Sequence, residues 1–153
     1  MDKTKNPGIV IEHVSLMEAD MKINNDFDKK KKKNQFQFNL QLTGFQRVVP
    51  PEDESRLLVV CSFDVMHKVD CPPFYFTCTF CAQYATVQQE KNMAWDEFSD
   101  VMAMAHVIPY IREFVSNMTN RMPGVPPLML PPVNVAVLIE DYAESLKAEE
   151  EGR

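Results

Sequence analysis

The chain has only four glycines in 153 residues, and they lie far apart. A nucleotide-binding loop needs clustered glycines, because its backbone must approach the phosphates closely. The sequence also lacks a Gly-x-Ser-x-Gly motif and the short-spaced Asp and His residues of a metal site. His13, His67 and His106 are scattered over different predicted elements. Arg112 and Glu113 are neighbours on a predicted helix, so they diverge, and structural ion pairs with other elements are favoured over a catalytic pair. We therefore expect neither catalysis nor a cofactor.

Long apolar runs are also missing. No run of about eighteen apolar residues is present, so we expect no membrane insertion. The N-terminal residues have no apolar core typical of a secretory signal peptide, which predicts a cytoplasmic protein. The formal net charge of −6 argues against nucleic acid as the main partner. For the five consecutive lysines at 29–33, a solvated loop is favoured over a site for an anionic partner.

Four cysteines raise the question of a metal site. Cys78 and Cys81 form a Cys-x-x-Cys motif, but their surroundings are typical of a strand. An offset of three in a strand puts two side chains on opposite faces, which disfavours a shared metal. Cys61, His67 and Cys71 keep a zinc site formally possible. We expect free, reduced thiols and no bound metal.

Four segments have strand patterns, at about residues 9–21, 35–43, 56–69 and 74–87. Short turns between the later strands favour an antiparallel meander. In the last three strands apolar residues recur at every second position: Phe36, Phe38, Leu40 and Leu42, then Leu57, Val59, Cys61, Phe63 and Val65, then Phe74, Phe76, Cys78 and Phe80. In the first strand, strict alternation puts Ile9, Ile11, Met17 and Met21 on one face and Val10, Val14 and Leu16 on the other. Two apolar faces and a free strand edge predict an oligomer.

The periodicity then changes to that of helices, predicted at about residues 96–122 and 134–147. Pro109 is expected in the first turn of the first helix, or as a kink in a longer one that starts near Trp95. Asn134 is positioned to cap the second helix. Strands first and helices last predict a single α+β domain over residues 1–153. Its four-stranded antiparallel sheet carries two C-terminal helices on one face.

The crossover between these helices, residues 123–132, is rich in proline. Five prolines fall within the eleven residues 122–132, which excludes both a helix and a central strand. The segment is nevertheless apolar, with Val125, Leu128, Met129 and Leu130. Such a loop either covers a core or presents apolar surface to a partner. For Met129, a flexible side chain that fits no helix face, both readings remain open.

The succession from Pro109-Tyr110-x-Arg112-Glu113 through the crossover to Leu130-Pro-Pro-Val-Asn134 resembles the C-terminal half of the bacterial SecB export chaperones. The match is specific over about forty residues, from Ile108 to Leu146. The resemblance implies a holdase that binds unfolded polypeptides for protein export or for a dedicated client. It also implies a homotetramer that is a dimer of dimers, assembled through the first strand and the long helix.

The same resemblance implies a client-binding groove framed by the sheet, the crossover and the second helix. The residues at matching positions are Val125, Leu128, Met129, Leu130, Val135, Leu138 and Tyr142, with Phe74 and Phe76 as further candidates. In the family, acidic residues on the solvent face of the sheet dock the export motor SecA. Glu18 and Asp20 offer comparable charge here, but Lys22 follows them, and the fourth strand carries no acidic residue.

Two alternatives therefore stay open. One is a SecB-like chaperone that guards an antitoxin and is not linked to SecA. The other, from a different functional class, is a structural or scaffolding module whose apolar loop seals a homo-oligomer.

Overall fold

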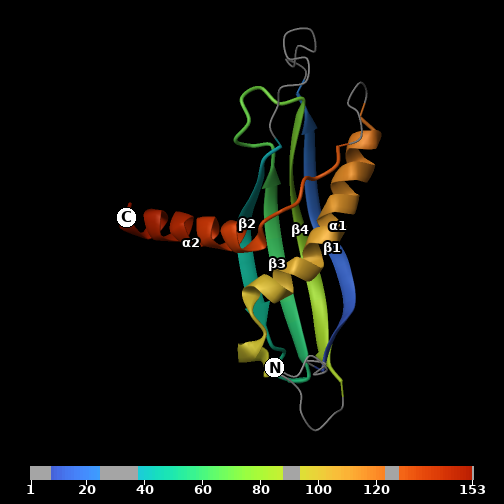
Figure 1. Cartoon of the computed structure of the whole chain (residues 1–153), viewed down its shortest axis with the longest axis vertical. Helices are drawn as coiled ribbons and strands as arrows, with labels where there is room; N and C mark the ends of the chain where they lie inside the picture. The colour runs from blue at the N-terminus through green and yellow to red at the C-terminus, as the bar shows by residue number, and fades with distance from the viewer. Residues whose placement is uncertain (1–7, 25–37, 88–93, 123–127, 153) are drawn as a thin grey trace.

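The computed structural model describes residues 8–24, 38–87, 94–122 and 128–152. Four strands, β1 (Ile9–Ile23), β2 (Leu40–Val48), β3 (Arg56–Val65) and β4 (Phe74–Thr86), precede two helices, α1 (Asp100–Asn120) and α2 (Val135–Glu151) (Figure 1). A single turn of 3-10 helix, η1 (Trp95–Glu97), lies just before α1. The predicted α+β fold with a four-stranded antiparallel sheet and two C-terminal helices is confirmed.

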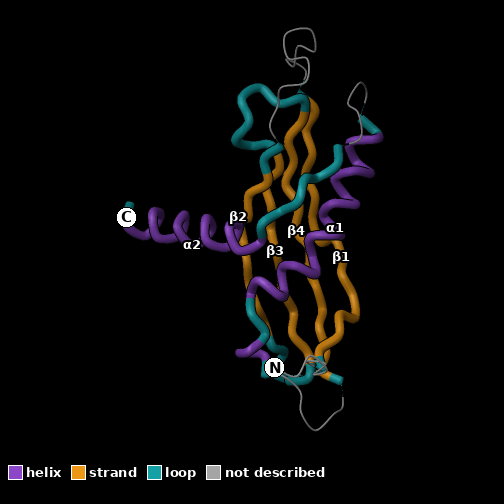
Figure 2. The backbone as a smooth tube through the Cα atoms, in the orientation of Figure 1, coloured by secondary structure: helices purple, strands orange, loops and turns teal. Residues whose placement is uncertain are grey.

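The strands lie in the order β1-β4-β3-β2, and every neighbouring pair is antiparallel. The meander expected from the short turns holds for β2, β3 and β4. β1, however, pairs with β4, so the first and second strands of the chain form the two opposite edges of the sheet (Figure 2).

Two β-bulges in β1 change the faces to which its side chains point. The register with β4 shifts between Ile11 and His13 and again between Leu16 and Glu18. Directly paired residues of neighbouring strands share a face. The β1 residues opposite the core-facing positions of β4 are Ile11, Val14, Leu16, Ala19, Met21 and Ile23, whereas Val10 lies on the other face, paired with Ala85. The prediction that Val14 and Leu16 lie on the face opposite Ile11 and Met21 is therefore wrong, because each bulge inserts one residue and resets the alternation.

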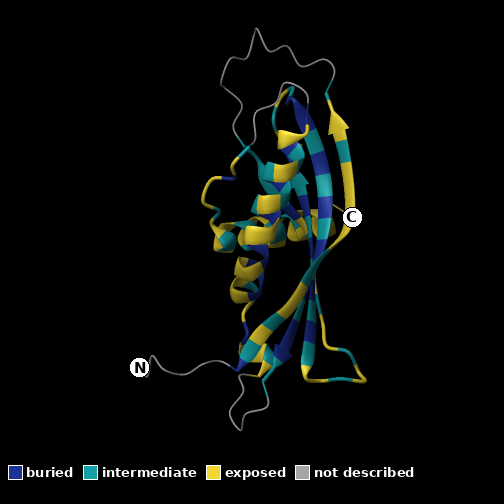
Figure 3. Ribbon diagram, turned by 90° about the vertical axis from the view of Figure 1, so that its right-hand side faces the viewer, coloured by how far each residue is buried: buried dark blue, intermediate teal, exposed yellow. Residues whose placement is uncertain are grey.

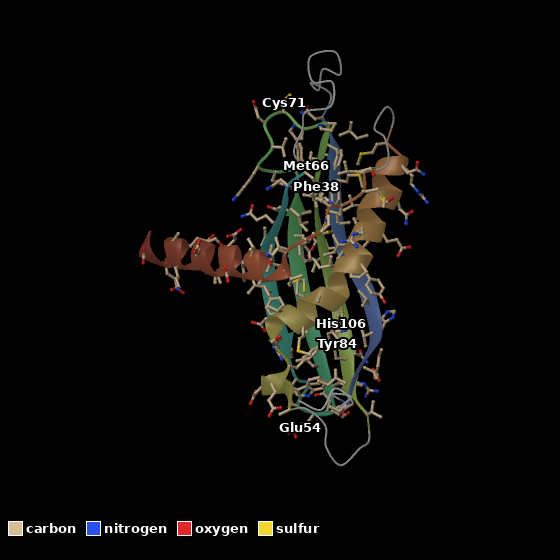
Figure 4. All side chains as sticks on the ribbon, in the orientation of Figure 1. Phe38, Glu54, Met66, Cys71, Tyr84 and His106 are labelled. Carbon is tan, nitrogen blue, oxygen red and sulfur yellow. The ribbon has the colours of Figure 1, made fainter. Side chains whose placement is uncertain are left out.

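The core lies between the sheet and α1, which crosses the sheet diagonally (Figures 1 and 3). Alternate residues of β3 and β4 are buried, as the strand patterns predicted. Tyr84 joins the two layers, since its hydroxyl donates to the Ala103 carbonyl at 2.7 Å. Its ring lies edge-on to that of His106 on α1, with 5.8 Å between centroids (Figure 4).

Arg47 on β2 fixes the beginning of α1. Its guanidinium forms an ion pair of 2.8 Å with Asp100 and donates to the Trp95 carbonyl at 2.7 Å. The Ser99 hydroxyl caps the helix by accepting from the Met102 N–H. Pro109 lies inside α1, well beyond its first turn.

α2 begins beside β2 and extends outward past this edge of the sheet (Figure 1). The Asn134 side chain accepts from the Val137 N–H, as predicted for the helix cap. None of the 17 residues of α2 is buried. The two helices thus cover the sheet unequally, because only the first half of α2 packs against the core.

Candidate functional site

A cleft of about 490 Å³ lies between the beginning of β2 and α2. Leu40 and Leu42 form part of its floor and Leu138 part of its wall. The complete lining is Asn39, Leu40, Gln41, Leu42, Lys68, Leu138, Asp141, Glu144 and Ser145. Two acidic residues and one basic residue border it, so the cleft combines apolar side chains with an acidic rim.

The open edge of β2 contributes backbone groups to this cleft. The Asn39 carbonyl accepts from the Met66 N–H at 2.8 Å, so it points toward β3. Backbone groups of an antiparallel strand point alternately to its two sides. Those of Leu40 and Leu42 consequently point to the outer edge, where the described residues supply no partner strand. The Asn39 side-chain oxygen is buried beside the cleft and lacks a hydrogen-bond partner in the described part of the chain.

The crossover residues differ sharply in exposure. Leu130 is 5% exposed and belongs to the core, whereas Leu128 is half-buried and Met129 is 71% exposed. The backbone N–H of Leu128 donates to the Thr119 hydroxyl at 2.8 Å, which fixes the segment to the end of α1. Val125, also predicted from the sequence to contact a ligand, lies outside the described residues. Within residues 128–130, only Met129 is free to offer its whole side chain to a partner.

α2 supplies the other predicted residues. Val135, Leu138 and Tyr142 are half-buried and pack at the border of the core. Ile139, which the site prediction omitted, lies with them, although its position on the apolar stripe could have identified it. Leu128, Val135, Leu138 and Tyr142 thus all pack against the core, but only Leu138 lines the cleft at β2.

Phe74 and Phe76 lie elsewhere. They are 0% and 1% exposed and stack on one another with 5.8 Å between ring centroids. Phe76 also contacts the ring of Phe114 on α1 edge-on. Because both side chains are enclosed, they support the site from within the core, and a ligand could reach them only if the covering elements moved.

The four cysteines lie on β3, on β4 and in the turn between these strands. All four are free, and the described residues contain no group of three or more side chains that could hold a metal ion. Burial raises the pKa of Cys61 and of Cys78 to about 12, so both stay protonated at neutral pH. Cys81 is on the opposite face of β4 from Cys78 and is half-buried.

Comparison with known proteins identifies the fold. Neither a protein-family model nor a curated protein matches the sequence. Among solved structures, a SecB-like chaperone of Mycobacterium tuberculosis, in complex with a ChAD peptide from the HigA1 antitoxin, superposes with a TM-score of 0.63. The match covers 82% of this chain and 90% of that chain at 19% identity. This chain has the SecB-like fold.

A second solved structure, a Streptococcus agalactiae protein of unknown function, matches with a TM-score of 0.45 at 12% identity, covering 81% of this chain and 97% of that chain.

None of the described helices of this SecB-like chain is long and apolar enough to cross a bilayer.

The face of the SecB-like sheet that points away from α1 carries acidic and polar side chains beside apolar ones such as Leu58 and Val60. Glu18 and Asp20 lie on it, opposite Thr79 and Thr77 of β4. Thr77 in turn pairs with Asp64 of β3, so Asp20 and Asp64 flank the same threonine. The sequence-based search missed Asp64, although its place between buried Phe63 and Val65 could have put it on this face.

Proposed function

We propose that this protein is a chaperone of the holdase type, which binds unfolded or non-native polypeptides and keeps them soluble without catalysis. The observation that carries the proposal is the cleft between the open edge of β2 and α2. Leu40, Leu42 and Leu138 lie there among polar side chains, beside backbone groups of β2 for which the described residues supply no partner strand. This combination suits an extended chain of varied sequence, which offers apolar side chains and main-chain donors and acceptors in any register.

Large apolar side chains are exposed in a non-native client but mostly enclosed in a folded one. Each such side chain that the cleft buries contributes about 1.5–3 kcal/mol, from which the cost of ordering the bound segment is subtracted. Leu128, Met129, Val135, Leu138 and Tyr142 are our proposed client contacts, and Val125 is a further candidate outside the described residues. Leu130, Phe74 and Phe76 are enclosed in the core, so we do not propose them as direct client contacts.

We further propose that the protein works in the cytoplasm as a homo-oligomer, with a dimer of dimers as the expected form. Leu16 and Met17 on β1 are 44% and 64% exposed, and Tyr110 on α1 is 41% exposed. Apolar surface of this kind on an edge strand is a pairing hazard that association of subunits would remove.

The proposal has two variants, which differ in which clients the protein binds and where it delivers them. Delivery to the export motor SecA is supported only by Glu18, Asp20 and Asp64 on the face of the sheet away from α1. A dedicated client is the other variant, because the mycobacterial structure with the same fold holds an antitoxin peptide. A purely scaffolding role is the alternative function, and the exposed apolar residues of β1 would serve it equally well.

An aggregation assay separates these functions. Leu138→Ser removes an apolar contact from the cleft, whereas Val137→Ser changes a 44% exposed residue on the same helix that does not line the cleft. We expect the wild type and Val137→Ser to suppress aggregation of an unrelated unfolded protein. Leu138→Ser should bind the client about tenfold or more weakly, from the loss of about 1.5–3 kcal/mol of burial. A wild-type protein without any suppression, even in excess, would exclude the holdase function and favour the scaffold.

A further inference from the structure

A second cleft, of about 280 Å³, lies between α1 and the crossover. Its lining consists of Pro109, Arg112, Glu113, Ser116, Asn117 and Met129. The five α1 residues are spaced at offsets of three, four, seven and eight, which places them along one face of the helix. Met129 forms the facing wall, and its sulfur lies 4.0 Å from the Ser116 hydroxyl.

Arg112 has an unusual environment in this cleft. Its side chain is half-buried, and its Nε is fully buried and has no hydrogen-bond partner among the described residues. Within the described part of the chain, the guanidinium forms no ion pair, in contrast to Arg47 and Arg56. The structural ion pair expected for Arg112 is therefore missing there, and a desolvated donor without a partner is unfavourable.

The chemistry of a guanidinium indicates what would complete the site. Its planar set of N–H groups matches a carboxylate, and such charge-assisted bonds are strengthened where water is largely excluded. Glu113 on the same rim carries the opposite charge and disfavours an anion. Met129, flexible and 71% exposed, offers an adaptable apolar contact beside the charge.

We propose that Arg112 binds a carboxylate of the client, with a neighbouring large apolar side chain of the client packed on Met129. This inference rests on the proposed holdase function and adds a selectivity to it. The carboxylate comes from an Asp or Glu side chain or from the C-terminus of the client segment. Because Met129 lies between Leu128 and Leu130 in the crossover, an extended client that follows this segment reaches both Arg112 and the cleft at β2.

Peptide binding tests the proposal. The probes are fluorescently labelled extended peptides that contain Leu and Phe and differ only in Glu or Gln beside one of them, each with a free or an amidated C-terminus. We expect the wild-type protein to bind the Glu peptide about tenfold more tightly than the Gln peptide when both are amidated. A preference for the free over the amidated Gln peptide would identify the terminal carboxylate as the ligand instead.

Two matched variants test whether Arg112 is the residue that recognises the carboxylate. Arg112→Gln should abolish the carboxylate preference, so that it binds the amidated Glu and Gln peptides equally. Glu113→Gln should enlarge the preference, because it removes a repelling charge from the same rim. Sizing and thermal melting of both variants check that fold and assembly are retained.

Three outcomes would overturn the proposal. Equal affinity of the wild type for all four peptides would show that no carboxylate is recognised. An unchanged preference in Arg112→Gln would place the recognition elsewhere. A loss of oligomeric mass in Arg112→Gln would show that the guanidinium pairs with another copy of the chain. If no peptide binds to the wild type at all, the holdase function itself fails, which is distinguishable from binding without charge preference.

Discussion

The Thr119 hydroxyl accepts a hydrogen bond from the backbone N–H of Leu128 and donates to the Val115 carbonyl, both at 2.8 Å. Thr119 is fully buried among apolar core residues. It satisfies a backbone donor of the crossover from within the last turns of α1. One hydroxyl thus links the long helix to the segment that carries the proposed client contacts.

Thr119→Val should loosen this link. The substitution keeps the shape of the side chain but leaves the Leu128 N–H without its acceptor, at a cost of about 1–3 kcal/mol. We expect a lower melting temperature and a weaker affinity for clients. Thr119→Ser, which keeps the hydroxyl, should behave nearly like the wild type. If Thr119→Val has the stability of the wild type, the hydrogen bond does not hold the crossover in place.

Met129 and Leu130 should separate binding from stability. Met129→Ser changes an exposed side chain, so the free energy of unfolding should stay within about 0.5 kcal/mol while client affinity falls. Leu130→Ser opens a cavity in the core and should destabilise the fold by about 2–5 kcal/mol. Chemical denaturation and client titration of both variants provide the measurement. Equal loss of stability in the two variants would contradict the different roles given to these neighbours.

The sequence predicts the parts of this structure that follow from local pattern. Alternation in β3 and β4 identified the core face, and Asn134 identified the beginning of α2. The sequence alone could not show which strand would lie beside β1, because that pairing joins residues far apart in the chain. It also could not show that Leu130 is enclosed while Met129 is exposed, since proline fixes the backbone of a loop but not its distance from the core.

The bulges of β1 are another feature that the sequence pattern did not predict. Strict alternation put Val14 and Leu16 on the opposite face from Ile11 and Met21, whereas the two inserted residues bring all four to the face that α1 covers. Leu16 on this face is nevertheless 44% exposed, because the diagonal path of α1 leaves part of β1 uncovered. The argument for an oligomer therefore depends on the apolar side chains of β1 that α1 leaves exposed.

Leu16→Asp should weaken subunit association. A carboxylate on this half-covered face would be desolvated in an interface, at a cost of several kcal/mol. We expect a shift toward the 17.6 kDa monomer in sedimentation or native mass measurements. Ser15→Asp is the matched control, since the same charge then lies on the opposite face of β1, paired with Cys81. Dissociation by both variants, or by neither, would show that this face of β1 does not form the interface.

The buried thiols predict how stability depends on pH. Their pKa rises from about 9 to about 12 on folding, because burial disfavours the thiolate. The unfolded chain therefore loses these protons first, and the stabilisation, complete below pH 9, should decline as pH rises toward 12. Urea denaturation at stepwise increasing pH measures this decline. Replacing Cys61 and Cys78 by Ala should make the free energy of unfolding depend less steeply on pH between pH 9 and 12. Independently, these two cysteines should resist alkylation in the native wild type at pH 8. Rapid alkylation of Cys61 or Cys78 without unfolding, or an unchanged slope in the double variant, would show that these thiols are not protected by the core.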